Sequence, residues 1–242
     1  MKTMHKKLIQ MTILALCAGT AGAFAADKPA KADTTAAAAA KKETAASRHV
    51  SDAIAVVRKL EDEARLHGVL AGARGIFIVP SYGRAALGVG GAGGTGILLV
   101  RRADDGWSSP VFYRTGGLSV GLQAGAEGGA MVLVLNNDKA IAEFMKKNNF
   151  SLNAKAGLTV INWNKTVQGS AGTGDVIAWT DTKGLFGDVA TLEFNDIRYD
   201  QAMTNAYYRR TLSASDVIEG KTGNPQAGPL VEALVAAAAS VR

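Results

Sequence analysis

The feature that most constrains the fold of this chain is a glycine-rich stretch. Six glycines fall within the nine residues 88–96, and the apolar run Ile97–Val100 follows at once. The spacing G-x-G-x-x-G occurs twice here, which is the pattern of a dinucleotide-binding loop. Such a loop leads into a helix whose N-terminus binds the pyrophosphate. The residues that follow are instead leucine-rich and stopped by Asp104, Asp105 and Gly106, so they predict a strand and an architectural role for the glycines.

A second glycine-rich stretch, residues 117–129, indicates what that role is. Successive residues alternate between small or polar and apolar, and this period of two is typical of a strand. Glycine in a strand costs conformational entropy and adds no packing, so such a row needs tight coiling or a group packed on the bare face. The small or polar positions are Gly117, Ser119, Gly121, Gln123, Gly125, Glu127 and Gly129, and the apolar positions are Leu118, Val120, Leu122, Ala124 and Ala126.

Two side chains, Gln123 and Glu127, are expected to project from this glycine face. If the face is buried, the carboxylate of Glu127 must be paired or hydrogen-bonded. We predict a structural hydrogen-bond anchor, and the alternative is a contact with the headgroup of a ligand.

The first residues are predicted to be an export signal that is removed. Residues 1–7 are basic, residues 8–21 are largely apolar, and residues 23–25 give the small-x-small pattern of a cleavage site. The single cysteine, Cys17, lies inside this segment, so the mature chain is expected to have neither a disulfide nor thiol chemistry. Lipidation of Cys17 is the alternative, although Leu16 stands where a lipoprotein site has a small residue. Export without disulfides fits a bacterial periplasm.

The rest of the chain is predicted to be a tether and one domain. Residues 26–47 have no large apolar side chain, which favours a flexible Ala/Lys-rich tether, and residues 48–242 have the length of a single domain. Loss of the three lysines of the signal lowers the formal net charge from +6 to +3. That charge permits attraction to anionic lipid but argues against nucleic-acid binding.

The domain is predicted to begin with a helix and a strand. Ser51 can cap an amphipathic helix that carries Ile54, Val57, Leu60 and Ala64 on one stripe. Residues 75–80 (GIFIVP) form a buried strand that stops at the proline.

Strands are predicted over most of residues 81–194, and helices after them. Residues 136–149 interrupt the strands with a short helix capped by Asn137 or Asp138. Three helices follow, in residues 199–210, in residues 213–220 after a Ser213 cap, and in residues 228–241 with Pro229 in the first turn. The predicted fold class is α+β, a glycine-rich, strongly coiled antiparallel β-sheet or small barrel flanked by N-terminal and C-terminal helices.

No catalytic or metal-binding constellation is recognised. The segment GLSVG around Ser119 matches the nucleophile elbow G-x-S-x-G, but that elbow is a strand-to-helix turn whose histidine comes later in the chain. Both histidines of the predicted mature chain, His49 and His67, precede Ser119. Two histidines without a cysteine give no convincing set of metal ligands, and no Gly-Lys-Ser/Thr follows the glycines. We therefore expect no enzyme activity, no metal and no cofactor.

Five segments in order make the chain similar to a known family. The segments GARGIFIVP, ALGVGGAGGTGILLVRR, GWSSPVFY, GLQAGAEGGAMVLVLNN and TKGLFGDVATLEF resemble the SYLF domain family over residues 69–194. Family members are lipid-binding modules without catalytic activity. The eukaryotic ones bind phosphoinositides, sit beside SH3 or FYVE domains, and in some cases, including yeast members, bind actin filaments.

The resemblance implies a non-catalytic domain that binds anionic phospholipid at a membrane surface. The predicted export signal makes this a secreted bacterial type, so we expect the cell envelope as its location and general anionic lipid in place of phosphoinositide. Cations beside apolar groups at loop ends suit an interfacial binder. The candidate lipid-binding residues are Arg101, Arg102, Lys165, Lys183, Phe186 and Trp163. The alternative function is a protein-interaction scaffold of the envelope, for which the tether and the last alanine-rich helix are the motivation.

Overall fold

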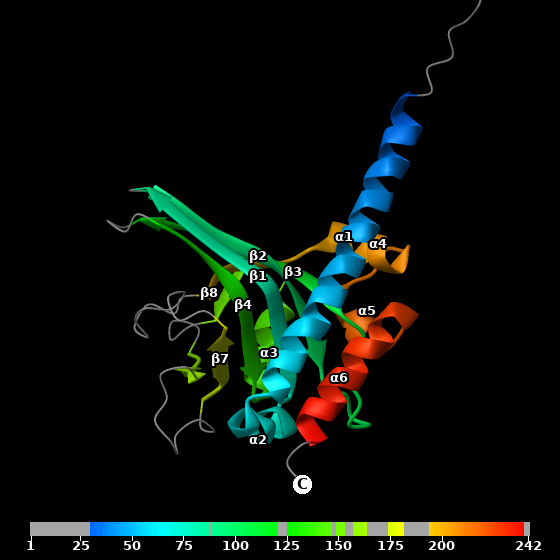
Figure 1. Cartoon of the computed structure of the whole chain (residues 1–242). Helices are drawn as coiled ribbons and strands as arrows, with labels where there is room; N and C mark the ends of the chain where they lie inside the picture. Colours follow the sequence, from blue (N-terminus) through cyan, green and yellow to red (C-terminus); the bar gives the residue numbers. More distant parts are fainter. Residues whose placement is uncertain are drawn as a thin grey trace, which may run out of the picture.

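The fold is an eight-stranded, strongly curved sheet with helices on both of its faces (Figure 1). The computed structural model describes residues 30–87, 89–120, 125–146, 149–152, 157–163, 174–181 and 194–239. The strand order is β5-β8-β3-β2-β1-β4-β7-β6, and every pair is antiparallel except the parallel pair β6–β7. The strands are β1 Gly75–Leu87, β2 Val89–Val100, β3 Val111–Val120, β4 Gly125–Leu135, β5 Phe150–Leu152, β6 Val160–Asn162, β7 Val176–Thr180 and β8 Phe194–Tyr199.

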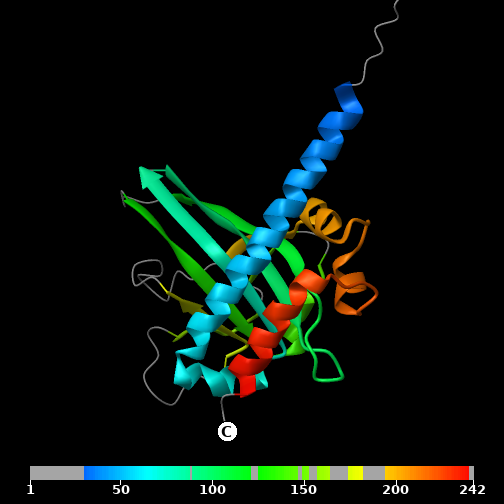
Figure 2. The same cartoon turned by 45° about the vertical axis from the view of Figure 1, so that its right-hand side comes forward.

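The helices lie mainly at the two ends of the chain, as predicted, and the predicted α+β class is confirmed. Helices α1, α4 and α6 cover one face of the sheet, called the helix face below, and α3 lies on the other (Figures 1 and 2). The sheet forms a half-barrel. The helices are α1 Ala30–Glu61, α2 Ala64–Gly72, α3 Asp138–Phe144, α4 Gln201–Tyr208, α5 Ala214–Ile218, the short 3-10 helix η4 Pro225–Ala227 and α6 Gly228–Ala239.

Local capping chemistry sets several of these helix ends. The Asn137 side chain accepts a hydrogen bond from the Ala140 N–H and begins α3, and Ser213 forms a capping box with Asp216 at the start of α5. Pro229 lies in the first turn of α6. These three predicted starts are confirmed.

The inner, α3-side face of the sheet holds an aromatic core. Rings of Phe77, Tyr113, Phe144 and Phe150 pack edge to face, with the Phe77 and Phe144 centroids 5.1 Å apart. The Tyr113 hydroxyl donates to the Phe144 carbonyl at 2.8 Å, and burial raises the pKa of Tyr113. This cluster fixes α3 against the concave side of the half-barrel.

Glycines of β2 make this packing possible, so their predicted architectural role is confirmed. A Cβ on Gly96 would lie 2.2 Å from Cζ of Phe77, and one on Gly94 would lie 2.6 Å from the Ser81 carbonyl oxygen. The glycine-rich stretch is therefore strand, in which the missing side chains admit an aromatic ring and a neighbouring backbone.

Three predictions about the elements are wrong. Strand β1 does not stop at Pro80 but continues to Leu87, with an irregular register at residues 79–82 where one extra residue is accommodated. Residues 117–129 are not one strand, because β3 ends at Val120, β4 begins at Gly125, and β1 and β2 lie between them.

The third wrong prediction is the flexible tether. The described part of residues 26–47 is helical from Ala30, in one piece with the predicted Ser51 helix, so Ser51 lies inside α1 and Ala64 belongs to α2. Ala46 is fully buried and belongs to the core. Alanine has the highest helix propensity, so an alanine-rich segment can form a helix even without large apolar residues.

Candidate membrane-facing surface

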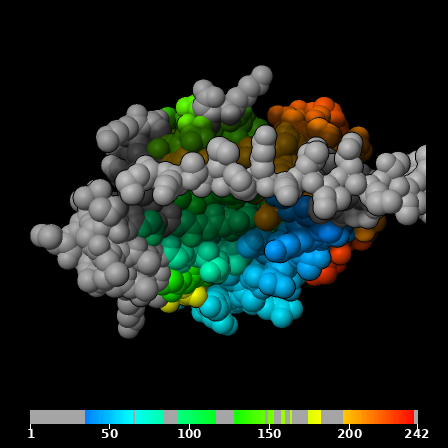
Figure 3. Space-filling model, turned by 90° about the horizontal axis from the view of Figure 1, so that it is seen from above, coloured from blue at the N-terminus to red at the C-terminus, as the bar shows by residue number. Residues whose placement is uncertain are grey.

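Helix α1 carries cations that have no anionic partner among the described residues. Lys41, Arg48 and Arg58 are exposed and Lys42 is half-buried. With about 3.6 residues per turn, Lys41, Arg48 and Arg58 fall on the outward side of α1. The opposite side buries Ala46, Val50, Val57 and Leu60. Figure 3 shows α1, in blue, open at the surface of the molecule.

Most other described cations already contact a carboxylate. Such a pair has its charge neutralised locally, so it attracts a further anion less than a free cation does. The described cations without a carboxylate partner are therefore concentrated on α1; the others are Arg210 after α4, and Arg101 and Lys139, which donate to backbone carbonyls. The paired cations are Lys59 with Asp181, Arg74 with Asp138, Arg102 with Asp104, Arg114 with Asp200, Lys146 with Glu143, Arg198 with Asp196, Arg209 with Glu43 and Lys221 with Asp216.

Helix α6 packs beside α1 and carries an exposed, mostly apolar side (Figure 2). Val235 is 50% exposed and is the large hydrophobic residue that the described part of the chain leaves most open. Ala236 and Ala239 are exposed on the same side, together with Glu232. We call Lys41, Arg48 and Arg58 of α1 with Val235, Ala236 and Ala239 of α6 the helical surface.

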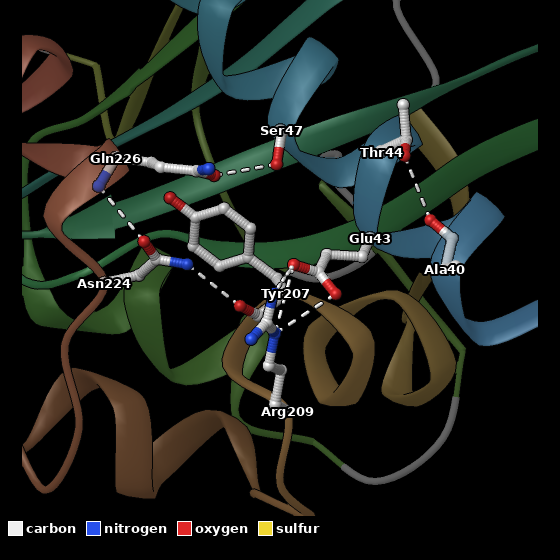
Figure 4. Close-up of polar contacts among 8 residues, drawn as sticks. All are labelled: Ala40, Glu43, Thr44, Ser47, Tyr207, Arg209, Asn224 and Gln226. Carbon is white, nitrogen blue, oxygen red and sulfur yellow. Dashed lines mark hydrogen bonds and ion pairs between the residues drawn. The ribbon is translucent and has the colours of Figure 1, made fainter. Parts of the chain in front are cut away.

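Polar contacts fix α1 against the C-terminal part of the chain (Figure 4). The Arg209 guanidinium donates to the Glu43 carboxylate at 2.7 Å and 3.1 Å, and the Ser47 hydroxyl donates to Oε1 of Gln226 at 2.7 Å. The bond and charge of Arg209 lower the pKa of Glu43. Arg209 adopts a left-handed conformation, with φ of 52°, that ends α4. These contacts hold the orientation in which the cations of α1 face outward.

His49 lies half-buried on α1. Burial lowers its pKa from 6.5, and the charge of Arg48 adds to this effect. The carboxylates of Asp52 and Asp200 oppose it. The neutral imidazole is therefore the form that the folded protein favours.

Arg101 closes strand β2 as predicted, but its side chain serves the fold. Its guanidinium donates to the carbonyls of Ala73 at 2.9 Å and Leu70 at 3.3 Å, at the C-terminal end of α2. It also lies 4.6 Å above the centre of the Trp107 ring, where the cation and the ring attract. Arg101 thus joins α2 to the β2–β3 connection.

Arg102 is likewise engaged. Its Nε and Nη2 donate to the Asp104 carboxylate at 3.2 Å and 3.0 Å, and the Gly106 N–H donates to the same carboxylate at 3.0 Å. The Gly106 bond and Arg102 lower the pKa of Asp104. The arrangement of Arg101 and Arg102 therefore favours a structural role over the lipid contact expected from the sequence.

The structure places the remaining predicted residues as follows. Trp163 is only 6% exposed, which argues against the lipid contact expected for this residue. Lys165, Lys183, Phe186, Gln123 and Gly121 lie outside the described residues. Gly117 lies on β3, and Gly125, Glu127 and Gly129 lie on β4. The register puts Glu127 opposite Arg84 of β1.

The cations of α1 are residues that the sequence analysis missed. Their signal was present, because Lys41 and Arg48 are seven residues apart, about two helical turns. Within the described ranges, no group of three His, Cys, Asp or Glu residues is placed to hold a metal ion. No described helix has the length and apolar character needed to cross a bilayer.

Comparison with known proteins gives the family. Residues 116–237 match the sequence model of the Ysc84 family, described as Las17-binding protein actin regulator. The chain therefore belongs to the Ysc84/SYLF domain family, which is linked to lipid and actin binding and is generally non-catalytic.

Individual relatives are eukaryotic proteins that carry further sequence. The human SH3 domain-containing YSC84-like protein 1 is 30% identical over 170 residues, which is 69% of this chain and 49% of that protein. Protein YSC84 of Saccharomyces cerevisiae is 24% identical over 172 residues, which is 69% of this chain and 36% of that protein. The chain thus spans half or less of the length of these relatives. No solved structure matches the chain.

Proposed function

We propose that this domain binds anionic phospholipid at a membrane surface, without catalysis, through the helical surface. The observation that carries the proposal is the set of cations on the outward side of α1 that have no carboxylate partner, whereas most of the other described cations are paired. Helix α6, whose exposed side is apolar except for Glu232, packs against α1. Cations beside exposed apolar groups are what a protein needs to bind at the boundary between headgroups and acyl chains.

The expected strength is that of reversible binding. Each lysine or arginine near an anionic membrane contributes about 1 kcal/mol. Lys41, Arg48 and Arg58 together would contribute about 3 kcal/mol, and each methyl group of Val235 that enters the hydrocarbon would add about 0.8 kcal/mol. Because nothing in this surface distinguishes one phosphate arrangement from another, we propose anionic phospholipid in general as the ligand. We also propose, from the export signal expected in residues 1–25, that the protein acts in a bacterial envelope.

Co-sedimentation with vesicles tests the proposal against a control of equal charge. The test variant is Lys41→Gln/Arg48→Gln/Arg58→Gln, and the matched control is Arg74→Gln/Arg198→Gln/Lys221→Gln, which removes three cations that are already paired. With phosphatidylglycerol-containing vesicles, the test variant should bind about a hundredfold more weakly, and the control should bind like the wild type. Equal loss in both variants would show that only net charge matters and would refute the assignment to α1. No binding of the wild type to any vesicle would refute the function.

A protein partner is the second candidate, and the exposed Val235 on α6 favours it. The family description makes actin filaments one partner to assay, and an envelope protein is the other. A photo-crosslinker at position 235 distinguishes the candidates. Protein adducts that form equally well without lipid would support the scaffold, and adducts to lipid would support the membrane.

A further inference from the structure

The ion pair between Arg209 and Glu43 joins the end of α4 to α1 and leaves its cation open to solvent (Figure 4). Nε and Nη2 of Arg209 donate to the Glu43 carboxylate, and the shortest of these bonds is 2.7 Å long. The Arg209 side chain is 78% exposed and the Glu43 side chain 32%. An anion that approaches this junction from solvent therefore meets the guanidinium before it meets the carboxylate.

The guanidinium of Arg209 has donors that Glu43 does not use. An arginine carries five N–H donors in a planar fork that fits both a carboxylate and a phosphate. The bonds to Glu43 involve Nε and Nη2, and Nη1 has no acceptor among the described residues. A phosphate can therefore bind at Nη1 while the pair is still closed, and it can take over Nε and Nη2 when the carboxylate moves away.

The backbone of Arg209 is in a conformation that suits glycine. Arg209 ends α4 in the left-handed region, with φ of 52° and ψ of 31°. Glycine or asparagine is the usual residue at this position, because a Cβ strains the left-handed conformation. Strain of this kind is retained where the side chain has a task. The guanidinium is therefore the part of residue 209 that this junction uses.

Cations without a carboxylate partner among the described residues flank this pair. Arg210 follows Arg209 and is exposed, and Lys41 precedes Glu43 by two residues on α1. Arg48 follows Glu43 by five residues, which is about 8 Å along the helix axis. The pair thus lies beside the helical surface, where an anionic membrane would bring phosphates.

A proton does not open the pair near neutral pH. The hydrogen bond and the charge of Arg209 lower the pKa of Glu43 from its ordinary value. The carboxylate therefore stays ionised in mildly acidic and in neutral solution. A competing anion is the agent that can take its place at Arg209.

We infer that Arg209 exchanges Glu43 for the phosphate of an anionic phospholipid when the domain binds a membrane, so that Glu43 limits the affinity. The inference rests on the proposed function and adds a regulatory contact to it. An exposed ion pair is weak and is screened by salt, so a surface dense in phosphates can compete with one carboxylate. The Ser47–Gln226 hydrogen bond and the buried Ala46 and Val50 still hold α1 when the pair opens.

A double-mutant cycle on vesicle binding tests the exchange. Affinity for phosphatidylglycerol-containing vesicles is measured with the full chain for the wild type, Glu43→Gln, Arg209→Gln and the double variant. Glu43→Gln frees one cation, so it should bind about fivefold more tightly than the wild type. Arg209→Gln should lower the affinity about fivefold in the Glu43→Gln background, but about twofold or less in the wild type, where Glu43 already engages Arg209.

Asp138→Asn is the matched control. It removes one carboxylate and frees the cation of Arg74, as Glu43→Gln frees Arg209, but α3 lies on the opposite side of the sheet from the helix face. Its affinity should stay within about twofold of the wild type, because salt screens a charge at that distance. Equal tightening by Asp138→Asn and Glu43→Gln would show that only net charge matters, and it would overturn the assignment to Arg209.

Inorganic phosphate distinguishes a lipid headgroup from a free ion as the ligand of Arg209. At an ionic strength matched with sodium chloride, phosphate should weaken vesicle binding by Glu43→Gln no more than chloride does, because a single ion lacks the neighbouring phosphates that a membrane presents to Lys41 and Arg210. A loss of binding specific to phosphate would make the free ion the ligand and overturn the exchange with lipid.

The failures of the two ideas are distinguishable. Vesicle binding by the wild type, with an equal effect of Arg209→Gln in both backgrounds, would overturn the exchange and leave the proposed function intact. A larger effect of Arg209→Gln in the wild type than in Glu43→Gln would also overturn it, because the pair would then act as one unit. Absence of vesicle binding by the wild type would refute the proposed function, and the exchange with it.

Discussion

Replacement of Gly96 by alanine tests why the glycine-rich strand exists. The new Cβ would lie 2.2 Å from Cζ and 2.3 Å from Cε2 of Phe77, where carbon atoms normally keep about 3.5–4.0 Å. The Phe77 ring is fully buried and is held by Phe144 and Tyr113, whose centroids lie 5.1 Å and 6.2 Å away. The ring therefore has no free space into which it can move.

The magnitude follows from two opposing effects. Overpacking a well-filled core costs about 1–3 kcal/mol, and a contact this short puts Gly96→Ala at the upper end of that range. Loss of glycine flexibility in a strand returns about 0.5–1 kcal/mol. We expect a net loss of about 2 kcal/mol in the free energy of unfolding, or about 4–8 °C in melting temperature for a domain of this size. Gly91→Ala on the same strand meets nothing within 4 Å and should be neutral or slightly stabilising.

Urea unfolding followed by circular dichroism measures both variants. A double-mutant cycle with Phe77→Leu adds a specific check, because the smaller side chain leaves room for the new methyl group. The combined variant should be more stable than the sum of the two single changes predicts, by about 1 kcal/mol or more. If Gly96→Ala and Gly91→Ala were equally stable, or the cycle were additive, the close-contact explanation would be refuted.

Three further predictions address the residues around α1 and α2. Arg101→Ala should lower the free energy of unfolding by about 1.5–3 kcal/mol, because it removes charged donors from the carbonyls of α2, and Arg102→Ala should lower it by less than about 1 kcal/mol. Vesicle binding should be unchanged in both variants, and a loss of binding in a folded Arg101→Ala variant would contradict the structural role. The pKa of His49 is lowered, so the unfolded chain binds the proton more readily, and the free energy of unfolding is highest above the ordinary pKa of 6.5 and falls as the pH drops below it. His49→Gln should make the free energy of unfolding less dependent on pH between 7.5 and 5. An unchanged pH dependence would exclude His49 as its source. Glu43→Gln should speed amide hydrogen exchange in residues 40–47 by weakening the contact with Arg209, while global unfolding stays nearly constant; unchanged exchange would show that buried residues alone hold this part of α1.

Local chemistry made several elements predictable from the sequence. The caps at Asn137 and Ser213 and the proline at position 229 act within a few residues, so their effect can be recognised without knowledge of the fold. Residues 117–120 and 125–129 were predictable as strand for the same reason, since the strand period is local.

Elements that depend on distant residues were not predictable. The alanine-rich start of α1 lacks large apolar residues, a composition that favours a tether. In the structure, however, Ala46 is buried, and Glu43 and Ser47 contact residues more than 160 positions away. Arg101 is a cation at the end of a strand, a position that suggests a lipid contact, but its partners are the backbone carbonyls of Leu70 and Ala73. Backbone acceptors leave no trace in a sequence pattern. The sequence therefore predicts a site at the loops, whereas the structure favours α1.

The irregular register at Pro80 lets the outer strand ends open independently of the rest of the sheet. Proline has no N–H to donate, and the extra residue interrupts the ladder on both sides of β1 just before Gly83. Openings that start at the outer strand ends therefore meet a break in cooperativity before they reach the aromatic core. The strand ends beyond Gly83 can therefore open by local fluctuations while the half-barrel beneath stays closed.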